Sequence, residues 1–161
     1  MAGKKTGGAL AVGDRAPDFE LPTDGGKTIK LSSLKGKPVI VYFYPKDDTS
    51  GCTKEACGFN DALPNFSKLK AEIIGVSKDS VASHDKFKKK YGLKFRLASD
   101  EELKVANAYG TWVEKSMYGR KYMGMERATF LIDGKGIIRG IWRKVKVPGH
   151  VDEVLAAAKK L

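Results

Sequence analysis

The segment that most constrains the fold is a nearly continuous apolar run, KPVIVYFYP, at residues 37–45. A strand with one solvent-exposed face alternates apolar and polar residues, whereas a strand buried on both faces is apolar throughout. Strands of the second kind occur in parallel sheets that helices cover on both sides. The run therefore predicts a central strand in the sheet of an α/β protein.

The segments after and before this run predict alternating strands and helices. Short apolar stretches bounded by turn residues predict strands at DFELP (18–22) and KTIKLSSL (27–34), joined by the turn TDGG, and at EIIGVS (72–77) and FRLAS (95–99). Helical patterns cover residues 52–70, 79–91 and 100–110, the last with an acidic first turn. Pro64 predicts a break in the first of these helices near Asn60–Leu63, because proline is disfavoured inside a helix.

The C-terminal part of the chain completes the pattern. ATFLIDGKGIIRGIW (128–142) predicts a β-hairpin, and HVDEVLAAAKKL predicts a closing amphipathic helix. The order β-β-β-α-β-α-β-α-β-β-α predicts a mixed central sheet flanked by helices, with the hairpin-then-helix ending of a thioredoxin-like fold. MYGRKYMGM (117–125) is expected to be a loop that packs on the domain rather than one that borders a substrate entrance.

Length and composition limit the number of domains and the cellular compartment that we expect for the protein. A chain of 161 residues is enough for one domain with a core, which we expect at residues 9–161 after a loose tail, MAGKKTGG, at residues 1–8. No apolar run approaches the ~20 residues that cross a bilayer, and no sustained apolar stretch follows the first lysines, so neither a membrane span nor a secretory signal is expected. Two cysteines are too few for a disulfide framework, which favours the cytoplasm.

The net charge of +11 raises the question of a nucleic-acid partner. The lysines are spread along the chain, with small clusters only at residues 86–90 and 143–146. Neither a zinc-finger spacing nor a helix-turn-helix signature is present, and aromatic residues do not interleave with the basic clusters as in a single-strand binder. We therefore interpret the charge as a solvated lysine-rich surface.

Both cysteines of the chain, Cys52 and Cys57, follow the buried strand directly. Thr49, Ser50 and Gly51 allow the chain to turn and start a helix, which places Cys52 in the first helical turn. Unpaired backbone N–H groups and the helix dipole favour a thiolate there, whereas Glu55 opposes one if its carboxylate faces the sulfur. A nearby cation would stabilise the thiolate, but the sequence pattern alone does not identify one.

The spacing of the two cysteines argues against a structural crosslink. Five residues of ideal helix rise about 7.5 Å and turn about 140°, which puts the Cα atoms of Cys52 and Cys57 roughly 8–9 Å apart. A disulfide needs Cα atoms closer than ~7 Å, so the two thiols can join only after local unwinding. Such a pair suits a cycle in which one thiol is oxidised first and the other traps it later.

Other interpretations of the pair remain open from the residues alone. Two cysteines in one helix are often small buried apolar residues. Zinc is disfavoured because His84 and His150, expected at the surface or in a helix-capping region, have no ligand spacing to the cysteines. A thioredoxin-type Cys-x-x-Cys is absent, since four residues separate the thiols.

The segment FYPKDDTSGCTKEAC closely resembles the active site of peroxiredoxins, in particular the peroxiredoxin Q or bacterioferritin comigratory protein class. The resemblance covers roughly residues 9–161 and includes GDRAPDFELP near the start and ERATFLIDGKGIIRGIWRKVKVPGH near the end. Pro45, Thr49 and Cys52 fit the family pattern Pro-x-x-x-Thr-x-x-Cys. The second cysteine five residues later and the late Arg-x-Thr-Phe-Leu-Ile-Asp make the combination specific.

The resemblance implies a role for each of these residues. Cys52 would be the peroxidatic cysteine, which attacks a hydroperoxide and becomes a sulfenic acid. Thr49 would offer its hydroxyl to the thiolate and to the peroxide, and Pro45 would shield the sulfur from water. Arg127 would supply the missing cation, lowering the pKa of the thiol and donating hydrogen bonds to the peroxide.

The resemblance also implies the rest of the cycle. Cys57 would be the resolving cysteine, giving an intramolecular disulfide that thioredoxin, or glutaredoxin in some members, reopens. No prosthetic group and no metal is implied, and the class is often monomeric, with a weak homodimer as the alternative. Ser50 stands where family members usually carry proline, and because proline restricts the backbone, we expect a less rigid loop here.

Two other functions compete with a thiol peroxidase. The first is a thioredoxin-like thiol–disulfide exchange protein, against which the absent Cys-x-x-Cys and the presence of Pro45, Thr49 and Arg127 speak. The second is a basic nucleic-acid-binding protein with incidental cysteines, which salt-dependent DNA binding would support.

Overall fold

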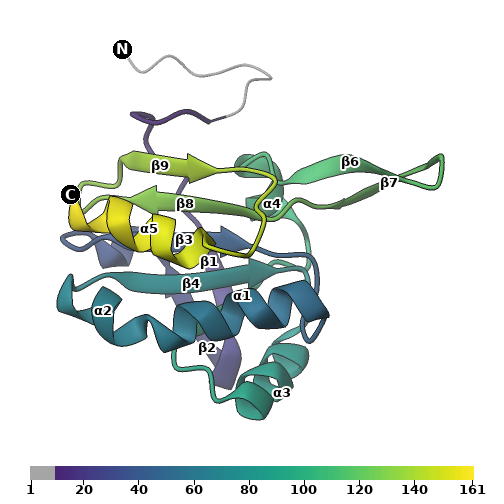
Figure 1. Cartoon of the computed structure of the whole chain (residues 1–161), viewed down its shortest axis with the longest axis horizontal. Coiled ribbons are helices and arrows are strands. Elements are labelled where there is room, and N and C mark those ends of the chain that lie inside the picture. Colours follow the sequence, from purple (N-terminus) through teal and green to yellow (C-terminus); the bar gives the residue numbers. More distant parts are fainter. Residues whose placement is uncertain (1–9) are drawn as a thin grey trace.

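The computed structural model describes residues 10–161, so the tail expected at residues 1–8 lies outside the described part (Figure 1). Seven strands form one sheet in the order β2-β1-β5-β4-β3-β8-β9. Their bounds are β1 Glu20–Thr23, β2 Lys27–Lys30, β3 Val39–Phe43, β4 Glu72–Ser77, β5 Arg96–Ser99, β8 Ala128–Ile132 and β9 Ile138–Trp142. The helices are α1 Ser50–Asp61, α2 Leu63–Lys68, α3 Val81–Tyr91, α4 Lys104–Ala108 and α5 His150–Lys159. None of these helices is long and apolar enough to cross a membrane.

Strand β3 lies in the interior of the sheet, between β4 and β8, as its apolar run predicts. It pairs parallel with β4 and antiparallel with β8, and all five of its residues are buried. Its side chains alternate between two cores, because successive residues of a strand point to opposite faces. Val39, Val41 and Phe43 join one core, whereas Ile40 and Tyr42 join the other.

Helices cover the sheet on the face to which Tyr42 points. Figure 1 shows α1, α2 and α5 crossing that face, where Phe59 of α1, Phe66 of α2 and Val154 of α5 are buried in one cluster. On the opposite face, Val105 and Ala106 of α4 join the other core. The predicted mixed sheet flanked by helices, with a hairpin and a helix at the end, is confirmed.

The predicted break in the first helix is also confirmed. α1 ends at Asp61 and α2 begins at Leu63, with Pro64 in its first turn, where proline needs no intrahelical N–H bond. α3 begins after Ser80, whose side chain accepts a bond from the backbone N–H of Ser83, and ends at Gly92 with φ of 64°.

Two predicted elements are shorter than expected. The strand predicted over residues 27–34 ends at Lys30, and Leu31–Leu34 form a 3-10 turn that buries both leucines. The helix predicted over residues 100–110 spans only Lys104–Ala108. The prediction of an acidic first turn is also wrong, because Asp100 lies before the helix. Its carboxylate accepts hydrogen bonds from the backbone N–H groups of Val105 and Ala106, and Leu103 has φ of 62°.

The loop predicted at residues 117–125 is instead part of a β-hairpin. Strands β6 Trp112–Met117 and β7 Arg120–Met125 form a separate two-stranded sheet that extends away from the body of the molecule (Figure 1). Met117, Tyr118, Tyr122 and Met123 are exposed on it, so the expectation that this segment packs on the domain is wrong. Apart from its base, where Met125 is buried, the hairpin is largely exposed and lacks the apolar alternation by which strands are predicted.

Both histidines are buried, so the expectation of surface positions is wrong, whereas the alternative of a helix-capping region holds for His150 at the start of α5. His84 lies between the Asp47 carboxylate, 2.7 Å from Nδ1, and the Ala98 carbonyl oxygen, 3.0 Å from Nε2. His150 begins α5, and its Nε2 lies 2.7 Å from the Thr129 hydroxyl. Each imidazole tolerates burial because it finds hydrogen-bond partners inside the protein.

Candidate active site

The chain leaves the sheet at the end of β3 and delivers Cys52 to the start of α1. Thr49 precedes the helix in an extended conformation, and Cys52 is the third helical residue, only 1% exposed. Its thiol joins the core that contains Ala56 and Phe59. The first turn of a helix presents unpaired N–H groups and the positive end of the dipole, which favours negative charge on the sulfur.

Arg127, immediately before β8, lies against this thiol. Its Nη2 donates to Cys52 Sγ at 3.4 Å, and its Nη1 donates to Glu55 Oε1 at 2.8 Å. Burial acts to lower the pKa of Arg127, but the neighbouring Glu55 and Cys52 outweigh it and the net pKa is raised. The guanidinium is therefore a permanent cation held on the sulfur, although 75 positions separate the two residues.

Glu55 has a role that the sequence did not predict. It is fully buried, and its carboxylate binds Arg127 instead of opposing the thiolate directly. Burial raises the pKa of Glu55 to about 7, against the opposing effect of Arg127, and its second oxygen has no hydrogen-bond partner in the described part of the chain. One helical turn separates Glu55 from Cys52, and this spacing was the available signal that one cation could serve both.

Gly51 is a second residue that the prediction missed. A Cβ atom at this position would lie 3.0 Å from Arg127 Nη2, so the missing side chain leaves room for the guanidinium. Glycine costs roughly 0.5–1 kcal/mol relative to alanine inside a helix. A glycine in the first turn beside a candidate nucleophile was the signal for such a close approach.

Thr49 and Pro45 lie in the loop between β3 and α1. The Thr49 hydroxyl donates to the Lys46 carbonyl oxygen at 2.9 Å, so its own oxygen is left as an acceptor. No bond between this hydroxyl and the Cys52 thiol occurs within residues 10–161, and Thr49 is exposed. Pro45 is half-buried directly after the buried run of β3.

A buried network ties this loop to the rest of the molecule. The Asp47 carboxylate accepts from the Tyr44 hydroxyl at 2.6 Å and from the Ser83 hydroxyl at 2.8 Å, and it pairs with His84. The Asp47 backbone N–H donates to the Asp79 carboxylate at 2.8 Å. The bonds of Asp47 to Ser83, His84 and Asp79 join residues more than 30 positions apart, which no local pattern in the sequence could predict.

Cys57 lies on the same intact helix as Cys52, as predicted. It is half-buried, both thiols are free, and burial together with Asp61 raises the pKa of the Cys57 thiol. Five residues of α-helix hold the two Cα atoms farther apart than the ~7 Å that a disulfide allows. In residues 10–161, no group of three or more histidine, cysteine or acidic side chains could hold a metal ion.

A free thiol at a helix N-terminus, with an arginine donating to its sulfur, is the arrangement of a candidate nucleophile. The sheet that carries it has the thioredoxin-like ending of a hairpin and a C-terminal helix. The class that this fold and this site define is the thiol-dependent peroxidases. The sequence model described as the AhpC/TSA family matches residues 12–141, and the chain belongs to that family.

Curated relatives agree with this assignment. A putative peroxiredoxin bcp of Coxiella burnetii is 55% identical over 147 residues, which cover 91% of this chain and 97% of the relative. Peroxiredoxin Bcp of Bacillus subtilis is 51% identical over 152 residues, covering 94% of this chain and 97% of the relative.

Solved structures agree as well. Peroxiredoxin Q of Xylella fastidiosa superposes with a TM-score of 0.90 at 39% identity, covering 95% of this chain and 98% of that one. The bacterioferritin comigratory protein of Xanthomonas campestris, studied for alkyl peroxide reduction, superposes with a TM-score of 0.85 at 46% identity, covering 88% of this chain and 90% of that one. The predicted resemblance to the peroxiredoxin Q class is confirmed, and the protein is a thiol-dependent peroxidase.

Proposed function

We propose that Cys52 is the peroxidatic cysteine and that it reduces hydrogen peroxide and organic hydroperoxides. Its thiolate attacks one peroxide oxygen, the O–O bond breaks, and the other oxygen leaves with a proton as water or an alcohol. The sulfur is thereby oxidised to sulfenic acid. The observation that carries this proposal is the 3.4 Å contact between Arg127 Nη2 and Cys52 Sγ.

Arg127 acts on both reactants in this step. Its charge stabilises the thiolate, and its remaining N–H groups are available to the peroxide oxygens, because a guanidinium carries five donors. Hydrogen bonds aimed at the developing charge lower the barrier more than equal binding of substrate would. Glu55 positions the guanidinium through its 2.8 Å ion pair and does not itself touch the peroxide.

Thr49 and Pro45 complete the proposed site from the loop before α1. Because the Thr49 hydroxyl donates to Lys46, its oxygen is free to accept a hydrogen bond from the O–H group of the peroxide. Pro45 has no N–H group that needs a hydrogen-bond partner, and its proposed role in the loop after β3 is to exclude water from the sulfur.

Cys57 is the proposed resolving cysteine. Its thiolate attacks the sulfenic sulfur of Cys52, the S–S bond forms, and the oxygen leaves as water after protonation. The intact α1 helix keeps the two thiols apart, so residues 50–60 must unwind before this step. A dithiol donor then supplies two electrons to reopen the bond, and thioredoxin is the proposed donor, with glutaredoxin as the alternative.

The proposed setting follows from the same chemistry. Two free thiols that cycle through a disulfide need a reducing compartment, which supports a cytoplasmic location. The catalytic residues all come from one chain, which supports action as a monomer or, at most, a weak homodimer.

A coupled assay tests the proposed cycle. Peroxide consumption is followed with thioredoxin, thioredoxin reductase and NADPH for the wild type, Cys52→Ser and Cys57→Ser, with insulin reduction as the assay for a general exchange protein. We expect Cys52→Ser to lose turnover completely, and Cys57→Ser to lose thioredoxin-dependent turnover while still consuming one equivalent of peroxide. Insulin reduction without peroxide consumption would favour the thiol–disulfide exchange protein instead.

A further inference from the structure

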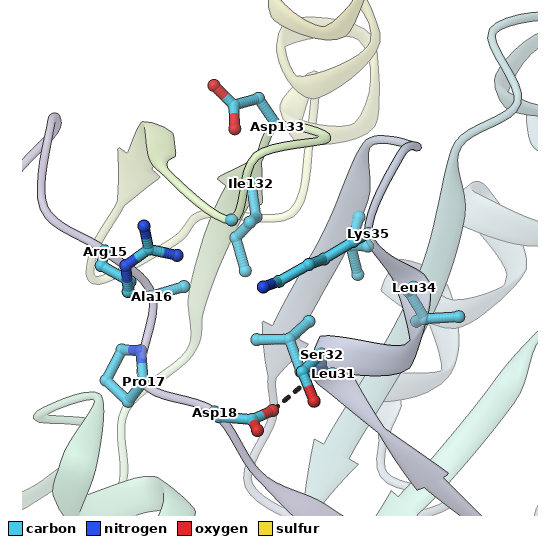
Figure 2. Close-up of a pocket in the computed structure, with 12 residues that line it drawn as sticks. Arg15, Ala16, Pro17, Asp18, Leu31, Ser32, Leu34, Lys35, Ile132 and Asp133 are labelled. Atoms are coloured by element: carbon cyan, nitrogen blue, oxygen red, sulfur yellow. Dashed lines mark hydrogen bonds between the residues drawn. The ribbon is translucent and has the colours of Figure 1, made fainter.

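A cavity of about 380 Å³ lies at the end of β3 remote from Cys52 (Figure 2). Val39 at the start of β3 lines it, whereas the chain reaches Cys52 only after Phe43 at the other end of the strand. Four positions of a strand span about 13 Å, and Val39 belongs to the core on the opposite face from Cys52. The cavity is therefore separate from the peroxidase site.

The floor of this cavity is apolar. Ala16, Leu31, Leu34, Val39 and Ile132 line it, and all five belong to the same hydrophobic core. A volume of this size falls at the lower end of the about 300–1,000 Å³ typical of small-molecule sites. The cavity can thus take one small molecule with an apolar body.

The two carboxylates at the rim are already engaged within the protein. Asp18 accepts from the backbone N–H groups of Phe19 and Ser32, both at 2.9 Å. Asp133 accepts from the backbone N–H groups of Lys135 and Ile137 and from Arg139 Nε at 2.7 Å. Neither carboxylate therefore needs a cation from a ligand.

The two cations at the rim are not engaged in the same way. Figure 2 shows the Lys35 and Arg15 side chains reaching into the cavity mouth from opposite sides. Lys35 has no hydrogen bond or ion pair within residues 10–161, and Arg15 makes one hydrogen bond, from Nη1 to the Lys135 carbonyl oxygen at 3.3 Å. The donors that remain free at the mouth therefore belong to the two cations.

We propose that this cavity binds a small monocarboxylate with an apolar chain, with the chain on the apolar floor and the carboxylate between Lys35 and Arg15. An apolar body places the ligand, and a few convergent polar groups fix its orientation, which is the general composition of small-molecule sites. Charge-assisted bonds from lysine and arginine to a carboxylate are the stronger kind, so the carboxylate is preferred over an uncharged end group. The site is independent of the proposed peroxidase cycle.

NMR titration of the reduced, ¹⁵N-labelled protein tests this site, with octanoate as the probe and octylammonium as the matched ligand of opposite charge. We expect saturable octanoate shifts at the amides of Ala16 and Leu31–Lys35, and much weaker binding of octylammonium. Lys35→Gln should weaken octanoate binding about tenfold, equivalent to about 1.4 kcal/mol, and Lys35→Glu should reverse the preference between the two probes. Lys27→Gln, which removes an exposed lysine that does not line the cavity, should leave binding unchanged.

Three results would overturn the proposal. The first is no saturable shift with octanoate, and the second is octanoate shifts that gather at residues 50–57 and Arg127 instead. The third is equal weakening by Lys35→Gln and Lys27→Gln, which would mean that net charge alone drives binding. Peroxide consumption by Lys35→Gln should equal that of the wild type, so failure of this site and failure of the proposed cycle are distinguishable.

Discussion

At the scale of single residues, the site depends on one guanidinium that serves two neighbours on α1. Arg127 reaches the sulfur of Cys52 with one nitrogen and the carboxylate of Glu55 with another. Gly51 leaves the space through which the guanidinium approaches. The geometry of the thiol's cation is therefore set by residues that have no thiol chemistry of their own.

Gly51→Ala tests that close approach. The added methyl group would lie 3.0 Å from Arg127 Nη2, and the flexible guanidinium must move away from the sulfur to relieve the contact. We expect the rate of Cys52 oxidation by peroxide to fall about tenfold or more, because small displacements of positioning groups cost large factors in rate. Unfolding free energy should change by less than about 1 kcal/mol, since alanine also favours the helix. Stopped-flow measurement of peroxide consumption checks the rate.

Gly58→Ala is the matched control on the same helix. Its added methyl group meets Val151 at 3.2 Å, not Arg127. It should leave the rate of Cys52 oxidation close to that of the wild type. Equal rate losses in both variants would mean that α1 itself, not the position of the guanidinium, limits the reaction.

Glu55→Gln isolates the buried carboxylate through the pH dependence of stability. The folded protein holds the Glu55 proton up to about pH 7, whereas the ordinary value is 4.5. The unfolded chain thus binds fewer protons in this window, and the stability of the folded state falls as pH rises through it. A shift of this size corresponds to about 3 kcal/mol.

Urea unfolding of both proteins at pH 4.5 and pH 8 measures this contribution. Relative to Glu55→Gln, the wild type should lose up to about 3 kcal/mol of unfolding free energy between the two pH values. All other titrating groups are shared and cancel in the difference. Parallel pH profiles for the two proteins would show that the carboxyl group is not held in the protonated form.

At the scale of elements, the predictability of the fold depended on whether a segment buries a face. β3 and the α1–α2 break were predicted because an apolar run and Pro64 act locally. β6 and β7 were missed because their hairpin has exposed side chains on both faces and no apolar alternation. The start of α4 was predicted too early in the chain. The Asp100 carboxylate accepts hydrogen bonds from backbone N–H groups in the first turn of α4, so Asp100 itself lies before the helix.

The residues of the candidate site also differ in how far the sequence could predict them. Cys52 and Cys57 could be chosen from their spacing and their place after a buried strand. Arg127 was identified only by family resemblance, since a residue 75 positions away has no local signal. The effect of Glu55 could only be stated conditionally, because the sequence does not show that its carboxylate pairs with Arg127.

The α1 helix must be stable enough to present Cys52 and weak enough to release Cys57. Ser50, its first residue, is exposed, and Thr49 before it has φ of −98° and ψ of 159°, the extended conformation that a following proline requires. Ser50→Pro therefore fits the folded structure at a position where helices accept proline. It should raise the unfolding free energy of the reduced protein by about 0.4–1 kcal/mol.

The same substitution should slow formation of the Cys52–Cys57 disulfide, because α1 unwinds less readily. More Cys52 would then be trapped as sulfinic acid under excess peroxide. Mass spectrometry of samples quenched over time measures both products. Faster disulfide formation in a more stable Ser50→Pro protein would contradict the requirement for unwinding.

At the scale of the whole molecule, the net charge of +11 is dispersed rather than focused. Several basic side chains pair with carboxylates at separate places, among them Lys37 with Glu72, Lys88 with Asp24 and Arg139 with Asp133. We expect only weak, sequence-independent binding to duplex DNA that is lost between 50 and 200 mM salt. Fluorescence anisotropy with labelled duplexes measures this; tight binding that persists at 200 mM salt would revive the nucleic-acid-binding hypothesis.

The central claim is a two-step peroxidase cycle within one chain. It rests on the two thiols of α1 and on the arginine that contacts the thiol of Cys52. Intact mass and peptide mapping after one equivalent of hydrogen peroxide, for the wild type and Cys57→Ser, test it most directly. The account predicts that the wild type loses two hydrogens through a Cys52–Cys57 bond, while Cys57→Ser gains one oxygen at Cys52. If neither thiol reacts within seconds, Cys52 is not a peroxidatic cysteine and the pair serves only to pack the core.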